Sequence, residues 1–181
     1  MKKTNLTRIA YDALLSAMCV ALGYYAIDLG TQKITLENLP ILIGALMFGP
    51  VDGAAIAAVG IFLSQMLRYG LDASTVLWII PYVVQGLFAG GWAKIRKFNM
   101  KPFEIVLLMI LSGVVVTAVN TLSLIIYHKY IIGSPIQSVI VAIPRRILVS
   151  AGKSVAFAIL VPLIIRGLEK AGIYRKSNYL R

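Results

Sequence analysis

Long apolar segments separated by short polar ones make up almost the whole chain. The apolar stretches lie at residues 9–27, 38–51, 53–67, 74–93, 103–127 and 137–165. A helix needs about 20 apolar residues to cross a bilayer, so the second and third stretches are short for a span and the others are long enough. The pattern predicts an all-α fold, an integral membrane bundle of six transmembrane helices that forms one domain over residues 1–181.

Residues 39–67 are open to a second interpretation, as one long helix that reduces the number of spans to five. The segment Gly49-Pro50-Val51-Asp52-Gly53 favours a break instead. Proline fixes one backbone torsion and glycine permits a positive one, which is typical of a turn. In the six-span interpretation, we expect Asp52 to cap the third helix.

The distribution of charge also favours six spans. The chain has 18 Lys and Arg against 7 Asp and Glu, a formal net charge of +11. With six spans and the N-terminus inside, 12 of the 18 cations are cytoplasmic: Lys2, Lys3, Arg8, Lys94, Arg96, Lys97, Lys101, Arg166, Lys170, Arg175, Lys176 and Arg181. Five spans would move nine of these outside, against the positive-inside rule. We therefore expect a multi-pass protein of the prokaryotic plasma membrane with both termini in the cytoplasm.

Composition and motifs exclude several classes of function. The chain is 59% hydrophobic and 14% charged, far from the average soluble domain. Because the excess cations set the topology and suit anionic lipid headgroups, no nucleic-acid partner is expected. One His, one Cys and the absence of metal-ligand spacing or a phosphate-binding glycine motif indicate no enzyme, no catalytic residue, no metal and no cofactor.

The sixth span carries cations that a membrane segment rarely tolerates. Arg146, Ser150 and Lys153 recur at i, i+4 and i+7 and share one helix face, while Arg145 lies about 100° away. A cation inside a span costs at least about 2.5–3.5 kcal/mol, so its default interpretation is functional. An anionic ligand, such as a carboxylate, would satisfy these residues.

A structural interpretation of the same cations is also open. Arg145 and Arg146 either pair with Asp72 or Glu37 in the outer loops or extend their charged ends toward the interface.

Polar residues in other spans point to the same outer half of the bundle. Trp78, Tyr82 and Gln85 share a face of span four and suit a flat heteroaromatic ligand, although aromatic residues also form interfacial belts. Gln65 ends span three, and Asn120 lies in a polar stripe of span five that is also typical of helix–helix contact. We infer a buried site that opens outward, with residues 28–38 as a candidate lid.

Ala13, Ala17 and Ala21 follow one another at a spacing of four in the first span. Small residues on one face let another helix approach closely. The face is suited either to packing inside this bundle or to docking of a partner membrane protein, and the spacing does not choose between them.

Together these features resemble the substrate-binding S components of energy-coupling factor (ECF) vitamin transporters. The resemblance rests on the basic six-span chain, the alanine face, the long first outer loop and the segment Met47-Phe48-Gly49-Pro50-Val51-Asp52-Gly53. It implies a high-affinity binder of a water-soluble vitamin that associates with a transmembrane coupling subunit and two cytoplasmic ATPase subunits. It also implies that Ala13, Ala17 and Ala21 contact the coupling subunit and that the protein topples in the bilayer to deliver its substrate.

The pair Pro144-Arg145 is most similar to the folate-type branch of that family. Folate implies a pterin near Trp78, Tyr82 and Gln85, and carboxylates near the span-six cations Arg145, Arg146 and Lys153. Pantothenate, biotin and nicotinate also carry a carboxylate and remain alternatives. Two other classes are open from the residues alone, a stand-alone channel or exporter and a structural subunit whose cations meet lipid or a partner's acidic groups.

Overall fold

The computed structural model describes residues 3–25, 27–28, 33–72 and 74–171. These residues form α1 (Lys3–Tyr24), α2 (Asn38–Phe48), α3 (Pro50–Tyr69), α4 (Thr75–Ile95), α5 (Pro102–Ile126), the π-helix η1 (Tyr127–Ile132) and α6 (Gln137–Lys170). The two-residue strands β1 (Ile27–Asp28) and β2 (Lys33–Ile34) pair antiparallel between α1 and α2. The predicted all-α class is confirmed, and residues 29–32 of the predicted lid lie outside the described residues.

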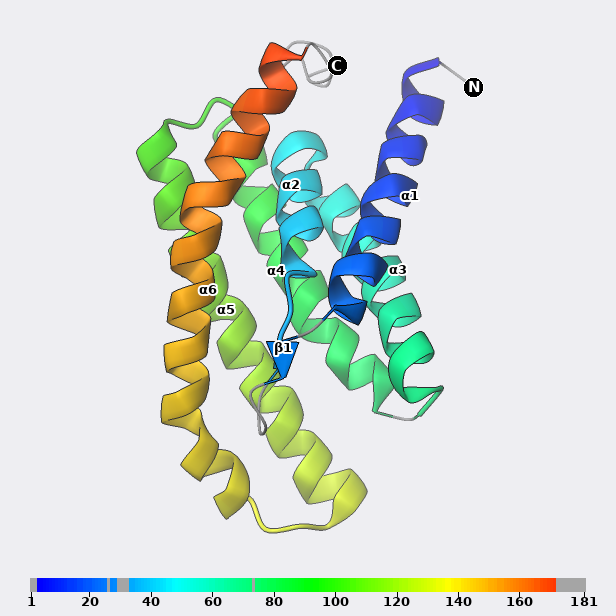
Figure 1. The fold of residues 1–181 in the computed structure, drawn as a ribbon, viewed down its shortest axis with the longest axis vertical. Helices are drawn as coiled ribbons and strands as arrows, with labels where there is room; N and C mark the ends of the chain where they lie inside the picture. The colour runs from blue at the N-terminus through cyan, green and yellow to red at the C-terminus, as the bar shows by residue number, and fades with distance from the viewer. Residues whose placement is uncertain (1–2, 26, 29–32, 73, 172–181) are drawn as a thin grey trace.

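The Lys3 end of α1 and the Lys170 end of α6 lie at the same end of the bundle (Figure 1). An even number of crossings requires this arrangement, which agrees with the six predicted segments. Five helices are long and apolar enough to cross a membrane, and α2 is the shorter apolar helix.

The predicted break between the second and third segments is present and is tighter than a four-residue turn. Gly49 alone separates α2 from α3, with a φ of 110° that favours glycine. Pro50 then begins α3, because the first position of a helix needs no backbone N–H donor. The expectation of a short third helix is wrong: α3 has 20 residues, whereas α2 has 11.

The short helix α2 occupies the interior of the bundle. Ten of its residues are buried, and it contacts α1, α3, α4 and α6. Neighbours on every side explain why the helix is apolar all round. Eleven residues rise about 16 Å, roughly half of the hydrocarbon core. In Figure 1, α2 (cyan) fills only the half of the bundle nearer to Lys3 and Lys170, so it begins at mid-depth among the other helices.

Close contact between α3 and α4 is built on glycine. A Cβ on Gly86 would lie 2.5 Å from the Gly53 backbone, and one on Gly90 would lie 2.5 Å from the backbone of Gly49 and Pro50. Real Cβ atoms do not approach backbone this closely, and backbone atoms have little freedom to move aside. The two glycines therefore set how closely α4 lies against the α2–α3 break.

Asp52 connects this break to α1. It lies buried in the first turn of α3, and its carboxylate accepts hydrogen bonds from the Arg8 guanidinium. Arg8 also donates to the Phe48 carbonyl oxygen at 3.0 Å. No side chain caps α3, so the expectation that Asp52 does so is wrong. The reason is that the tertiary structure places a cation beside its carboxylate.

We expect Gly90→Ala to lower the free energy of unfolding by about 1–3 kcal/mol, because its methyl group overpacks the α3–α4 contact. Gly91→Ala is the matched control, since a Cβ there has no atom within 4 Å. Thermal unfolding in detergent, followed by size-exclusion chromatography, measures both variants. Equal stability of the two would contradict the proposed contact.

Candidate functional site

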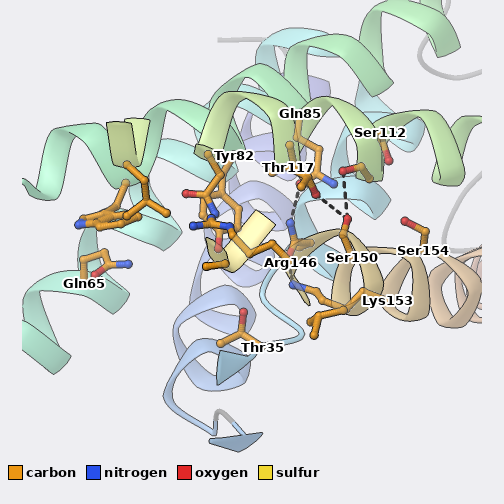
Figure 2. A pocket seen from close by; sticks show the side chains of 18 of the residues that line it. Thr35, Gln65, Tyr82, Gln85, Ser112, Thr117, Arg146, Ser150, Lys153 and Ser154 are labelled. Atoms are coloured by element: carbon orange, nitrogen blue, oxygen red, sulfur yellow. Dashed lines mark hydrogen bonds between the residues drawn. The ribbon is translucent and has the colours of Figure 1, made fainter. Parts of the chain in front are cut away.

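A cavity of about 590 Å³ lies among α4, α5 and α6, with the start of α2 and the last turns of α3 completing its wall. This volume falls within the usual range for small-molecule sites, roughly 300–1,000 Å³. Figure 2 shows polar side chains from several helices directed into the same space.

Seven of the eight residues predicted to bind a ligand line this cavity: Gln65, Trp78, Tyr82, Gln85, Asn120, Arg146 and Lys153. Arg145 does not line it and is exposed. The difference follows from helix geometry, because neighbouring residues point about 100° apart while i, i+4 and i+7 share a face. Accordingly, Ser150 lines the cavity together with Arg146 and Lys153.

The deep part of the cavity is closed by a hydrogen-bonded chain across three helices. Lys153 of α6 donates to Asn38 Oδ1 at 3.0 Å, and Asn38 Nδ2 donates to Gln85 Oε1 of α4 at 2.7 Å. Asn38 and Gln85 are almost fully buried. Buried polar groups need such partners, and these bonds also orient both amides along the cavity wall.

Sequence reasoning did not identify Asn38 as a site residue, because it placed Asn38 at the boundary between the outer loop 28–38 and the second apolar stretch 38–51. The signal for a helix start is present, since Pro40 lies in the first turn of α2. The local sequence does not predict how deep in the bundle this helix begins.

Glu37, the residue before α2, is also inside the bundle, with 5% of its surface exposed. Its Oε1 accepts hydrogen bonds from the Tyr82 hydroxyl at 2.6 Å and from the Thr35 hydroxyl at 2.8 Å. Tyr82 and Thr35 both line the cavity. The carboxylate therefore lies directly behind the cavity wall rather than in an exposed loop.

Hydroxyl groups form the wall between α5 and α6. Thr117 donates to Ser150 Oγ, which donates to the Gly113 carbonyl oxygen at 3.2 Å. Thr117 lies one turn before Asn120 in the polar stripe of span five, and its bond to Ser150 shows the helix–helix contact that such a stripe is typical of. In the same stripe, Asn120 Oδ1 is buried with no hydrogen-bond donor among the described residues.

The outer part of the cavity is aromatic. Trp78 of α4 and Tyr127 of η1 lie with ring centroids 6.0 Å apart and planes tilted by 57°, and both line the cavity. Asp72 also lies on the lining and is exposed, and its carboxylate accepts a hydrogen bond from the Ser74 hydroxyl at 2.8 Å. Aromatic faces near the mouth suit the apolar or ring portion of a ligand.

Arg146 extends from α6 toward Tyr82 on the opposite wall (Figure 2). Within the described part of the chain, its guanidinium has no hydrogen-bonded or ion-paired side chain. Among the described residues, Arg146 therefore forms no direct ion pair with Asp72 or Glu37, the alternative that the sequence left open. Five donors in a planar fork remain for a group brought in from outside, and a carboxylate matches that fork.

The alanine face of α1 points away from the bundle. Ala13, Ala17 and Ala21 are exposed. The inward face of α1 consists of other residues, including Cys19 and Gly23, which pack against α3. The interpretation in which these three alanines pack against other helices of this bundle is therefore wrong.

Comparisons with known proteins identify a family and a shared fold. Residues 7–174 match the family described as "ECF transporter, substrate-specific component". No curated protein matches the chain significantly in sequence. Among solved structures, the S-component for biotin from an ECF-type ABC transporter superposes with a TM-score of 0.71. The match covers 94% of each chain at 18% identity, which shows a shared fold.

Proposed function

This chain belongs to the family of ECF transporter substrate-specific components, and from that premise we propose that it captures a carboxylate-bearing vitamin in the α4–α5–α6 cavity. The observation that carries the proposal is Arg146, a guanidinium without a side-chain partner in the described residues, on the wall of a cavity inside a membrane bundle. Such a cation is costly unless an anion joins it. The remaining wall offers amides, hydroxyls and aromatic rings for the uncharged part of a ligand.

We propose folate as the first ligand to test. The aromatic outer wall and the buried amides of Gln85 and Asn38 suit a flat heterocycle with several donors and acceptors. Pro144-Arg145 adds the resemblance to the folate-type branch. Pantothenate, biotin and nicotinate are the alternatives, because each brings one carboxylate. The biotin S-component shares the fold at 18% identity, a likeness that does not favour one of these vitamins.

The exposed alanine face supports the second half of the proposal, the association with a transmembrane coupling subunit. Three small side chains on the outside of α1 leave room for the close approach of another helix. In the proposed assembly, two cytoplasmic ATPase subunits supply the energy. The S component then delivers the vitamin by toppling in the prokaryotic plasma membrane.

Mass spectrometry of the protein purified in mild detergent tests the ligand directly. We expect a vitamin to co-purify, or to bind after dialysis when folate, pantothenate, biotin and nicotinate are titrated. Intrinsic fluorescence reports the event, because Trp78 lines the cavity and Trp92 does not, so Trp78→Phe should remove the signal. A protein that ignores the whole panel, or that conducts solutes in proteoliposomes without partners, would contradict the proposal.

We expect Arg146→Ala to weaken vitamin binding by about 2–5 kcal/mol, roughly 30-fold or more in Kd, because the ligand carboxylate loses its buried partner. Arg145→Ala is the comparison, since it removes the same side chain from an exposed position outside the cavity lining. Calorimetric titration measures both variants. Equal losses would place Arg145 in the binding site, and unchanged affinity in Arg146→Ala would remove Arg146 from it.

We expect Ala17→Trp to abolish co-purification with the coupling subunit and to leave vitamin affinity unchanged, because an indole fills the space for the partner helix. Val155→Trp on the exposed side of α6 is the matched control and should retain the complex. Pull-down of the co-expressed subunits measures association, and titration measures binding. Retention of the complex by Ala17→Trp would refute the docking surface.

A further inference from the structure

A buried carboxylate lies where a membrane protein can least tolerate one. Glu37 exposes 5% of its surface, in the interior between the described helices, yet it does not line the cavity. A charge in such a place is costly unless hydrogen bonds and an opposite charge compensate it. Ligand binding as proposed above gives this residue no role.

The surroundings of Glu37 supply partners to its carboxylate. Tyr82 and Thr35 both donate hydrogen bonds to Oε1. The residue also precedes the first turn of α2, where the positive end of the helix dipole favours an anion. On the other side, α1 closes over the group: a Cβ on Gly23 would lie 2.7 Å from Oε2.

Lys153 of α6 is the cation that connects to this carboxylate through the neighbouring residue Asn38, without a direct ion pair between the two side chains. Its ammonium is bonded to Asn38, the residue next to Glu37, at 3.0 Å, and the Glu37 charge acts on it electrostatically. Arg146 extends into the open cavity instead. Asp72 is the acidic residue of the described lining, and it is exposed at the mouth, where water screens its charge.

We propose that Glu37 is the internal counter-ion of Lys153 and a specificity-determining residue, which leaves Arg146 as the one cation on the described cavity lining that is available to a ligand carboxylate. The inference rests on the proposed function and assigns the cavity to ligands that bring one carboxylate inside. Folate satisfies this limit when one of its two carboxylates stays in water at the mouth. The hydrogen bond to Tyr82 adds a positioning role, since it holds the aromatic wall in place.

The balance of charge is testable with pairs of ligands that differ only in charge. The probes are biotin against biotinamide, pantothenate against pantothenol, nicotinate against nicotinamide, and folate against its diamide. Glu37→Gln keeps the shape of the side chain and an acceptor for Tyr82 and Thr35 while it removes the negative charge. We expect it to raise the preference for the charged member of the bound pair by about tenfold or more.

Lys153→Met should do the opposite, because an uncompensated Glu37 repels the ligand anion. The double variant Glu37→Gln/Lys153→Met should return the preference close to that of the unmodified protein. Glu104→Gln is the matched control: it removes a carboxylate that pairs with Arg96 outside the cavity lining and should leave the preference unchanged. A preference that does not change in Glu37→Gln, or that the double variant does not restore, would overturn the inference.

Thermal unfolding in detergent supplies a measurement that needs no ligand. Lys153→Met should lower the unfolding temperature more than the double variant does, because only the single variant leaves a buried charge unpaired. A double variant less stable than Lys153→Met would refute the pairing. If no vitamin binds, the proposed function fails, and the unfolding temperatures of the single and double variants still test whether Glu37 and Lys153 are paired. If a vitamin binds but these variants show no coupling, only the pairing fails.

Discussion

The arrangement of this protein depends on the position at which α2 begins. A helix of eleven residues covers about half of the hydrocarbon core, so its first turn and the residues before it lie inside the bundle. Polar groups at that depth have no bulk water to bind, and each needs a partner from another helix. Tyr82 and Thr35 satisfy Glu37, while Gln85 and Lys153 satisfy Asn38. Because the polar groups at the start of α2 need hydrogen-bond partners, side chains of α4 and α6 converge there and border a polar cavity.

Close packing between α3 and α4 places α4 where its polar side chains can reach the start of α2. Gly86 and Gly90 let α4 lie directly against the start of α3, and α4 carries Tyr82 and Gln85 to the side of α2. At the other end of α2, the pair of Arg8 and Asp52 connects α1 to the α2–α3 break. Both ends of the short central helix are therefore held by neighbouring helices, and hydrogen bonds to those helices position the inner wall of the cavity.

Much of the candidate site could be predicted because helical periodicity is local. Arg146, Ser150 and Lys153 share a face at i, i+4 and i+7, as do Trp78, Tyr82 and Gln85, and the structure directs both faces into one cavity. The same rule separates Arg145 from its neighbour. The burial of Glu37 and the role of Asn38 could not be predicted from the sequence, because they depend on depth in the bundle and on Tyr82, Gln85 and Lys153, partners that lie 45 or more residues away.

The sequence by itself determined that the chain is a bundle of apolar helices, where the helices break, and which polar residues share a helix face. These properties follow from hydrophobic periodicity, Gly-Pro chemistry and the distribution of Lys and Arg, all of which act over a few residues or along the membrane normal. Only the tertiary structure decided that α2 begins halfway through the bundle (Figure 1), that Asp52 pairs with Arg8, and that Glu37 lies beside the cavity. The physical reason is that burial and pairing of charge depend on contacts between helices distant in the sequence, where the free energy of desolvation must be compensated by whichever partner the fold brings near.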